Sequence, residues 1–152
     1  MISVHIPFFP PSTNHAYLST SHGRILTKEG KRYKTEVQHF LGQHCPGFIA
    51  FFKPNIEYEI LFMLYFEAGS LYTKSWPKNT EVSRHKRIDA TNRVKLLEDV
   101  ITETAGYNDC QHFAFSVVKT EASVNQHPFT DVYAWDEQED GPLARYRHTR
   151  IG

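Results

Sequence analysis

Acidic residues lie on both sides of one predicted helix, in the stretch RIDATNRVKLLEDVI and the turn GYNDCQ that follows it. Asp89 comes before this helix and Asp109 after it. Carboxylates in such loops are suitable ligands for hard divalent cations such as Mg²⁺, which prefer oxygen donors. The same residues also suit ordinary roles, because an aspartate before a helix is a common N-terminal cap and Asn-Asp is frequent in turns. Spacing alone leaves both interpretations open.

The helix itself has one apolar face and one polar face. Its apolar residues repeat with the helical period and are Val94, Leu97 and Ile101. Its polar face carries Lys95, one turn into the helix. A lysine there can contact a phosphate oxygen, but a lysine on a polar helix face is more often simply solvated. Lys95 therefore indicates a functional site only together with other residues.

Basic residues concentrate in the connection between residues 68 and 88. They are Lys74, Lys78, Arg84, Lys86 and Arg87. Such a cluster attracts phosphates through counterion release, and connections of this length are uncommon unless they have a function. The alternative is a soluble charged loop. We predict a DNA-binding segment and keep the alternative open.

The overall composition limits the classes of protein. The chain has 152 residues, with 17 Lys and Arg against 17 Asp and Glu, so its formal net charge of zero indicates no partner by itself. Cys45 and Cys110 are far apart in the sequence and suggest neither a zinc ribbon nor a disulfide framework. No apolar stretch is long enough to span a membrane. We expect a cytoplasmic protein with no membrane partner.

The pattern of residues predicts an α+β domain. We predict strands at 2–6, 24–26, 56–67, 112–122 and 129–136. The strand at 56–67 is strongly apolar and is predicted to be central and buried on both faces. An irregular loop is expected after the prolines at residues 7–11, and a helix is expected after Thr27 as its N-cap.

These elements do not alternate regularly as strand and helix. They therefore indicate a small single domain in which a mixed β-sheet packs on helices. We place this domain at residues 1–135. The remaining residues, 136–152, are predicted to form a polar C-terminal tail.

Two separated parts of the sequence resemble one known family, the RusA-like Holliday-junction resolvases. The first part is IPFFPPSTNHAY followed by GRILTKEGKRYKTEV, and the second is RIDATNRVKLLEDVI with AGYNDCQ. The resemblance implies a RusA-like α+β fold and a homodimer. It also implies cleavage of branched DNA that depends on Mg²⁺ or Mn²⁺.

The second part carries the residues that the resemblance implies for the site. Asp89 corresponds to the first metal ligand and Asp109 to the last. Asn92 corresponds to a supporting amide, and Lys95 to the catalytic lysine. On this basis Asp89, Lys95 and Asp109 are the expected catalytic residues.

The sequence departs from the family at Thr91, where the family has a second aspartate. A hydroxyl can ligate Mg²⁺ but supplies no negative charge, so metal affinity is expected to be lower. Asp99 and Glu103 lie further along the same helix face and are candidates to compensate, with Asp99 as a supporting residue.

We therefore predict a metal-dependent endonuclease, a crossover junction resolvase that acts on four-way DNA junctions. Two alternatives remain, a junction-binding homologue that does not cut DNA and a protein-interaction module of the same fold. A helix over residues 90–105 would be about 24 Å long at 1.5 Å per residue. Asp89 and Asp109 would then lie near its opposite ends. Either the chain after Gly106 folds back sharply, or the helix is shorter than predicted, or two subunits share the site.

Overall fold

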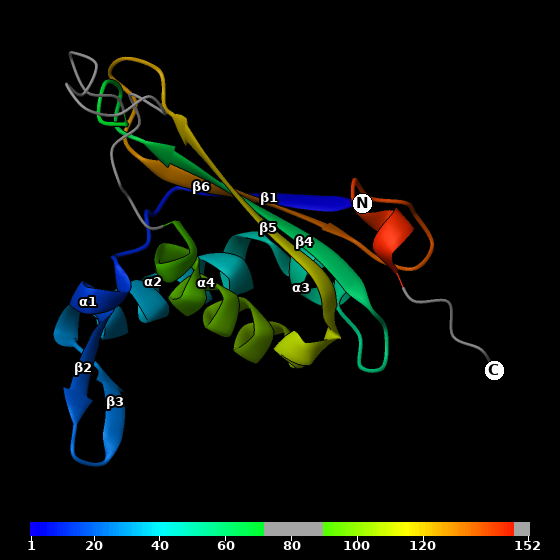
Figure 1. Ribbon diagram of the computed structural model, residues 1–152, viewed down its shortest axis with the longest axis horizontal. Helices are drawn as coiled ribbons and strands as arrows, with labels where there is room; N and C mark the ends of the chain where they lie inside the picture. The colour runs from blue at the N-terminus through cyan, green and yellow to red at the C-terminus, as the bar shows by residue number, and fades with distance from the viewer. Residues whose placement is uncertain (72–89, 148–152) are drawn as a thin grey trace, which may run out of the picture.

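The computed structural model describes residues 1–71 and 90–147 and shows a mixed β-sheet with helices packed on one side (Figure 1). Its elements are, in chain order, β1 (Ile2–Ile6), α1 (Thr13–Ala16), β2 (Tyr17–Thr20), β3 (Gly23–Leu26), α2 (Lys28–His44), α3 (Pro46–Phe51), β4 (Tyr58–Phe66), α4 (Ala90–Ala105), the 3₁₀ turn η1 (Asp109–Gln111), β5 (His112–Glu121), β6 (Phe129–Trp135) and the 3₁₀ turn η2 (Ala144–Tyr146).

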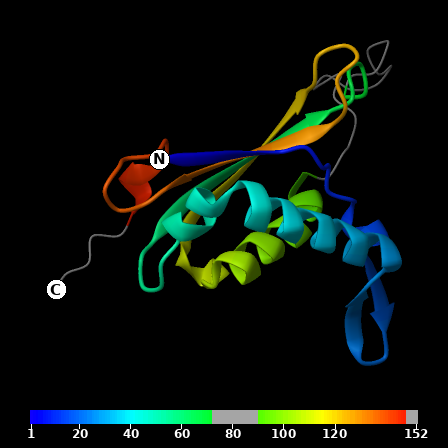
Figure 2. The ribbon, with the colours of Figure 1, turned by 180° about the vertical axis from the view of Figure 1, so that it is seen from behind.

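The main sheet has four strands in the order β1-β6-β4-β5. β4 pairs in parallel with β5 and antiparallel with β6, which itself pairs antiparallel with β1. The connection between the parallel strands passes through α4, as a crossover between parallel strands requires. All the α-helices of the described part lie on one side of this sheet (Figures 1 and 2). The predicted α+β class and mixed sheet are confirmed.

β4 is central, as predicted, but it is not buried equally on its two faces. The fully buried residues alternate along the strand and are Ile60, Phe62 and Leu64. On the other face Leu61, Met63 and Tyr65 are only half-buried. The prediction of burial on both faces is therefore wrong for the second face, because the helices cover only one side of the sheet.

The first turn of α2 is fixed by two small residues. Thr27 is the N-cap, as predicted, and its Oγ1 accepts a hydrogen bond from the Gly30 backbone N–H at 3.0 Å. Gly30 is buried because α1 packs against this turn. A Cβ at that position would lie 2.5 Å from the backbone oxygen of Ala16, so no larger residue fits without displacement of α1.

The prediction of an irregular loop before α2 is wrong in one respect. β2 and β3 form an antiparallel hairpin that extends away from the sheet (Figure 1). Leu18 pairs with Ile25 in its register, and their side chains are 55% and 53% exposed. The pattern gave little indication of β2, because a strand of an isolated hairpin has no buried face to impose alternation.

α4 packs its apolar face on the sheet and on α2. Val94, Leu97 and Ile101 are at most 1% exposed, and burial of such a side chain contributes roughly 1.5–3 kcal/mol. The helix ends at Ala105, followed by Gly106 in the left-handed conformation with φ of 74°. Both its length and its C-terminal glycine agree with the prediction.

The tail contacts the body of the protein in the part that the structure describes. The Leu143 backbone N–H donates a 2.8 Å hydrogen bond to Oε1 of Glu59, a buried carboxylate on β4. The Arg147 guanidinium lies 4.9 Å from the centre of the Phe113 ring. The basic residues of the predicted DNA-binding segment lie outside the described residues, as does Asp89. Within the described ranges, no helix has the length and apolar character needed to cross a bilayer.

Candidate metal centre

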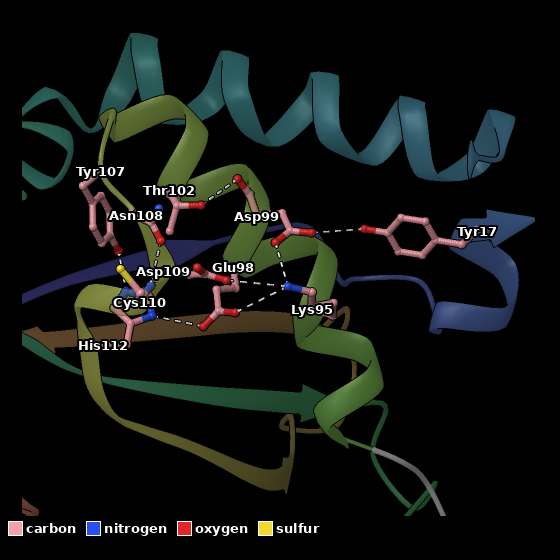
Figure 3. A network of polar contacts seen from close by, with 10 residues as sticks. All are labelled: Tyr17, Lys95, Glu98, Asp99, Thr102, Tyr107, Asn108, Asp109, Cys110 and His112. Atoms are coloured by element: carbon pink, nitrogen blue, oxygen red, sulfur yellow. Dashed lines mark hydrogen bonds and ion pairs between the residues drawn. The ribbon is translucent and has the colours of Figure 1, made fainter. Parts of the chain in front are cut away.

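Three carboxylates come together on the polar face of α4. Glu98 and Asp99 lie next to each other on the helix, and Asp109 approaches from η1 (Figure 3). One oxygen of each lies within 4.8 Å of the others. Their side chains are partly accessible, with exposed fractions of 13%, 35% and 49%. We call these three residues the acidic cluster.

Lys95 lies beside the acidic cluster and contacts all three members. Its Nζ donates a hydrogen bond to Oδ1 of Asp99 at 3.0 Å. The same nitrogen lies 3.8 Å from Oδ2 of Asp109 and 4.0 Å from Oε1 of Glu98. The hydrogen bond to Asp99 raises the pKa of Lys95, and partial burial opposes this effect without cancelling it. Lys95 is therefore a firmly charged cation at the edge of the cluster.

Asp109 reaches the cluster because the chain reverses after α4. Gly106 allows this reversal, and both its backbone N–H and that of Tyr107 donate to the Thr102 carbonyl. Asn108 then caps η1 through a reciprocal bond with Gln111. The turn places the Asp109 carboxylate back along the helix, at the level of Lys95 and the other two acids.

Gln111 attaches this turn to the rest of the fold. Its Nε2 donates hydrogen bonds to the backbone carbonyls of Lys53 and Ile56, at 2.9 and 2.8 Å. These carbonyls belong to the segment that leads into β4. The position of Asp109 is therefore set by packing and hydrogen bonds around η1, and not by the helix alone.

Two further side chains, those of His112 and Tyr107, lie on the interior side of Glu98. His112 begins β5, and its side chain is only 3% exposed. Its Nδ1 lies 3.0 Å from Oε2 of Glu98, and its Nε2 lies 2.7 Å from the Tyr107 hydroxyl (Figure 3). Burial raises the pKa of Tyr107 above the ordinary phenol value.

Tyr17 connects the acidic cluster with the β2–β3 hairpin. Its hydroxyl donates to Oδ2 of Asp99 at 3.4 Å. Burial, and then the charge of Asp99, raise the pKa of the Tyr17 phenol, which therefore stays protonated and acts as a donor at neutral pH. Asp99 thus receives hydrogen bonds from both Lys95 and Tyr17.

The structure brings together three of the residues that the sequence indicated, namely Lys95, Asp99 and Asp109. Thr91 lies in the first turn of α4 and is exposed. It is one turn from Lys95 on the same face but about 12 Å from Asp99 along the axis, at 1.5 Å per residue. The structure describes the backbone of Asn92 within α4.

Several residues of the site were missed by the sequence analysis. Glu98 is the most important, although the adjacent acids in the sequence LLED and the spacing of three residues from Lys95 were available signals. His112 and Tyr107 gave no signal of this kind. Glu103, proposed as a compensating acid, lies outside the cluster and instead forms a 2.6 Å ion pair with Lys34 of α2.

The acidic cluster fits a hard divalent cation by the chemistry of its donors. All of them are carboxylate oxygens, which Mg²⁺ and Mn²⁺ prefer, and their partial exposure leaves room for the waters that Mg²⁺ retains. An open polar pocket adjoins the cluster and is lined by Asp99, Thr102, Glu103, Tyr107, Asn108 and Asp109. The fold and site thus define a small α+β protein with a carboxylate centre next to a lysine.

A comparison with protein families identifies the family of this chain. The model of the family described as Endodeoxyribonuclease RusA matches residues 7–128, which include the hairpin, α4, the acidic cluster and β5. The chain therefore belongs to the RusA endodeoxyribonuclease family, as the motifs of the sequence predicted. Among curated proteins no match was found.

Proposed function

We propose that this protein is a divalent-metal-dependent endonuclease that resolves four-way DNA junctions. Membership of the RusA family supports an endonuclease that acts on Holliday junctions. The observation that carries the metal dependence is the acidic cluster of Glu98, Asp99 and Asp109 around Lys95. We take Mg²⁺ as the natural ion, with Mn²⁺ as a chemically similar substitute.

The acidic cluster holds the ion in this proposal. A bound divalent cation activates water as a nucleophile and stabilises the charge that develops on the scissile phosphate. Asp109 and Asp99 offer the more exposed carboxylates, and Glu98 offers a less exposed one. Asp89 and Thr91 are proposed as additional ligands on the basis of the family motif.

Lys95 acts on the phosphate in the same proposal. An ammonium group has three donor protons, and the bond to Asp99 occupies one of them. The remaining donors can neutralise charge on a phosphate oxygen next to the cluster. The raised pKa of Lys95 keeps the group protonated throughout the neutral range. Asn92 is proposed as an amide that supports the ligands.

The DNA contacts extend beyond the cluster. We propose that Lys74, Lys78, Arg84, Lys86 and Arg87 bind the phosphate backbone of the junction. We also propose a homodimer, because a four-way junction has two-fold symmetry and two symmetric sites would cut opposite strands. The exposed pair Leu18 and Ile25 on the hairpin offers apolar area for such an interface.

One observation favours a second candidate function, a junction-binding protein that does not cut DNA. Thr91 replaces an expected aspartate and removes one negative charge from the motif. A weaker metal site would then leave DNA binding intact while the chemistry is lost. The presence of Glu98 and Asp99 in the cluster argues for retained metal binding, so we prefer the enzyme.

A cleavage assay separates these two functions. We expect the wild-type protein to cut a synthetic four-way junction with Mg²⁺ and to bind it without cutting in EDTA. Asp109→Asn should bind the junction with similar affinity but give no product. Asp140→Asn, at an exposed position in the tail, is the matched control. Binding without products at all Mg²⁺ and Mn²⁺ concentrations would favour the non-cleaving homologue.

A further inference from the structure

A chain of hydrogen bonds leads from the protein interior to one member of the acidic cluster. It begins at the Tyr107 hydroxyl, passes through both ring nitrogens of His112 and ends at Oε2 of Glu98 (Figure 3). The Tyr107 ring stacks on Phe52 with 4.5 Å between ring centroids and an angle of 2° between the planes. The chain therefore starts from a rigid position in the core.

The direction of each hydrogen bond follows from the chemistry of the groups. A phenol is protonated at neutral pH, so Tyr107 donates to Nε2 of a neutral His112 ring. The ring proton must then be on Nδ1, which donates to the Glu98 carboxylate. A doubly protonated ring also carries a proton on Nδ1. Glu98 thus receives the same hydrogen bond in either protonation state of His112.

This bond limits the orientations of the Glu98 carboxylate. Ordering a glutamate side chain costs conformational entropy, and the bond at Oε2 imposes part of that order before any ion binds. The other oxygen, Oε1, is the one that lies 4.0 Å from Lys95. Oε2 thus faces the interior, whereas Oε1 is left on the side of the lysine.

We propose that His112 is a positioning residue that orients Glu98 as a ligand of the divalent cation, with Tyr107 fixing the tautomer of His112. This inference rests on the proposed function. Hydrogen bonds to metal-ligating carboxylates hold the ligand in place, and their loss typically reduces metal affinity about 10- to 100-fold. His112 itself does not touch DNA or the ion in this role.

Two substitutions of His112 separate positioning from packing. His112→Asn retains an N–H donor near the place of Nδ1, whereas His112→Leu fills a similar volume without any donor. Both remove the bond to Tyr107, and both alter the packing of a buried site. Positioning predicts that Mn²⁺ affinity stays close to wild type in His112→Asn but falls about tenfold or more in His112→Leu.

The decisive readout is Mn²⁺ binding to the metal-free protein, followed by electron paramagnetic resonance, with and without Glu98→Gln. In the Glu98→Gln background His112→Leu should cause no further loss, because the carboxylate that it orients is already gone. If His112→Leu does not fold, as judged by circular dichroism, Tyr107→Phe gives the same comparison. It should weaken Mn²⁺ binding in the wild-type background only.

The outcomes distinguish this inference from the proposed function. Wild-type binding of Mn²⁺ that is lost in Asp109→Asn but unchanged in His112→Leu and Tyr107→Phe would overturn the positioning role and leave the metal centre standing. Equal losses in the presence and absence of Glu98 would likewise assign His112 to packing alone. Failure of the wild-type protein to bind Mn²⁺ would overturn both.

Discussion

The amine of Lys95 lies 3.8 Å from a carboxylate oxygen of Asp109, although the rest of α4 and a chain reversal separate the two residues in sequence. The contact is made by the turn after Gly106, which returns Asp109 to the middle of the helix. Lys95 therefore supplies the positive charge next to the acidic cluster, which contains two acids from α4 and one from η1.

Replacement of this lysine should separate catalysis from metal binding. We expect Lys95→Met to reduce cleavage roughly 100-fold or more, as for loss of one charge-stabilising donor. Affinity for Mn²⁺ should rise, because a positive charge that repels the ion is removed. In metal-free buffer the free energy of unfolding should fall by less than about 1 kcal/mol, because the ion pairs are partly exposed, and Mn²⁺ should restore it.

Junction cleavage, Mn²⁺ titration and urea denaturation measure these three quantities. Lys28→Met, on the exposed first turn of α2, is the control for loss of one lysine. Reduced affinity for Mn²⁺ in Lys95→Met would contradict the placement of the ion in the acidic cluster.

A charge at position 91 tests the departure from the family motif. Thr91 lies one turn before Lys95 on the same face of α4, so Thr91→Asp adds a carboxylate on the side of the proposed site. We expect stronger Mn²⁺ binding and faster cleavage. Thr91→Asn introduces a side chain with the shape of aspartate but without its charge, and this variant should behave like the wild type. No gain from Thr91→Asp would show that Glu98 and Asp99 already complete the ligand set.

Removal of its charges tests the predicted basic segment. Simultaneous replacement of Lys74, Lys78, Arg84 and Lys86 by Gln should weaken junction binding and flatten its salt dependence. Each phosphate contact that is lost should reduce the logarithmic salt slope by about 0.9. Replacement of four exposed residues outside the segment by Gln removes the same number of charges and controls for a general change of charge; they are Lys28, Lys31, Lys53 and Arg145. A slope equal to that of the wild type would identify the segment as a solvated loop.

Much of this fold could be predicted from local patterns. The cap at Thr27 and the glycine at position 106 each act within one turn of chain, and the apolar period along α4 acts within one helix. These signals gave the correct start of α2 and the correct end of α4. The central position of β4 followed from its apolar composition, although its composition did not reveal that one face would be left half-covered.

The site was only partly predictable, because its geometry depends on contacts between distant segments. Asp109 reaches the cluster through a turn that Gln111 holds to the backbone before β4, and no sequence spacing encodes this connection. His112 looks like any strand residue until its partners on α4 and in the turn are known. Glu98 could have been included, since it lies one turn from Lys95, but adjacent acids on a helix are also common on solvated faces.

The buried Tyr33 offers a test of stability and its pH dependence. Tyr33 is 5% exposed, and its hydroxyl has no hydrogen-bond partner among residues 1–71 and 90–147. Tyr33→Phe should therefore increase the free energy of unfolding by about 1 kcal/mol, the lower end of the cost of an unsatisfied buried group. Tyr146→Phe, at a 60% exposed position, should have no effect.

The same variant should change stability at alkaline pH. Burial raises the pKa of Tyr33 above the ordinary phenol value of about 10. Above about pH 10 the unfolded state therefore loses the phenolic proton while the folded state keeps it, and wild-type stability falls as the pH rises. Phenylalanine has no proton to lose. Urea denaturation between pH 8 and 11 should show a widening advantage of Tyr33→Phe, and a constant difference would contradict burial of a neutral phenol.

The last prediction concerns a site that is shared between two subunits. α4 has its full predicted length, so its first residue, Ala90, lies about 14 Å from Asp99 along the helix axis at 1.5 Å per residue. The turn after Gly106 returns Asp109 to Lys95, with 3.8 Å between the amine and a carboxylate oxygen, so the chain does fold back and the Asp109 carboxylate does not lie at the far end of α4. We predict that a site using Asp89 together with Glu98 and Asp99 involves a second ion or a second subunit. We favour the second subunit, because the proposed homodimer supplies it without additional ions.

Mixing two inactive variants tests this arrangement. If the residues are shared across the two-fold axis, heterodimers of Asp89→Asn with Asp109→Asn contain one intact site and should regain nicking of a four-way junction, at up to half the activity per dimer. If each site is built within one subunit, every site in the mixture carries a lesion and no activity returns. Heterodimer formation must be verified with subunits of different mass, since failure to exchange would imitate the second result. Verified heterodimers without nicking would exclude the shared site and leave Asp89 to act, if at all, within its own subunit.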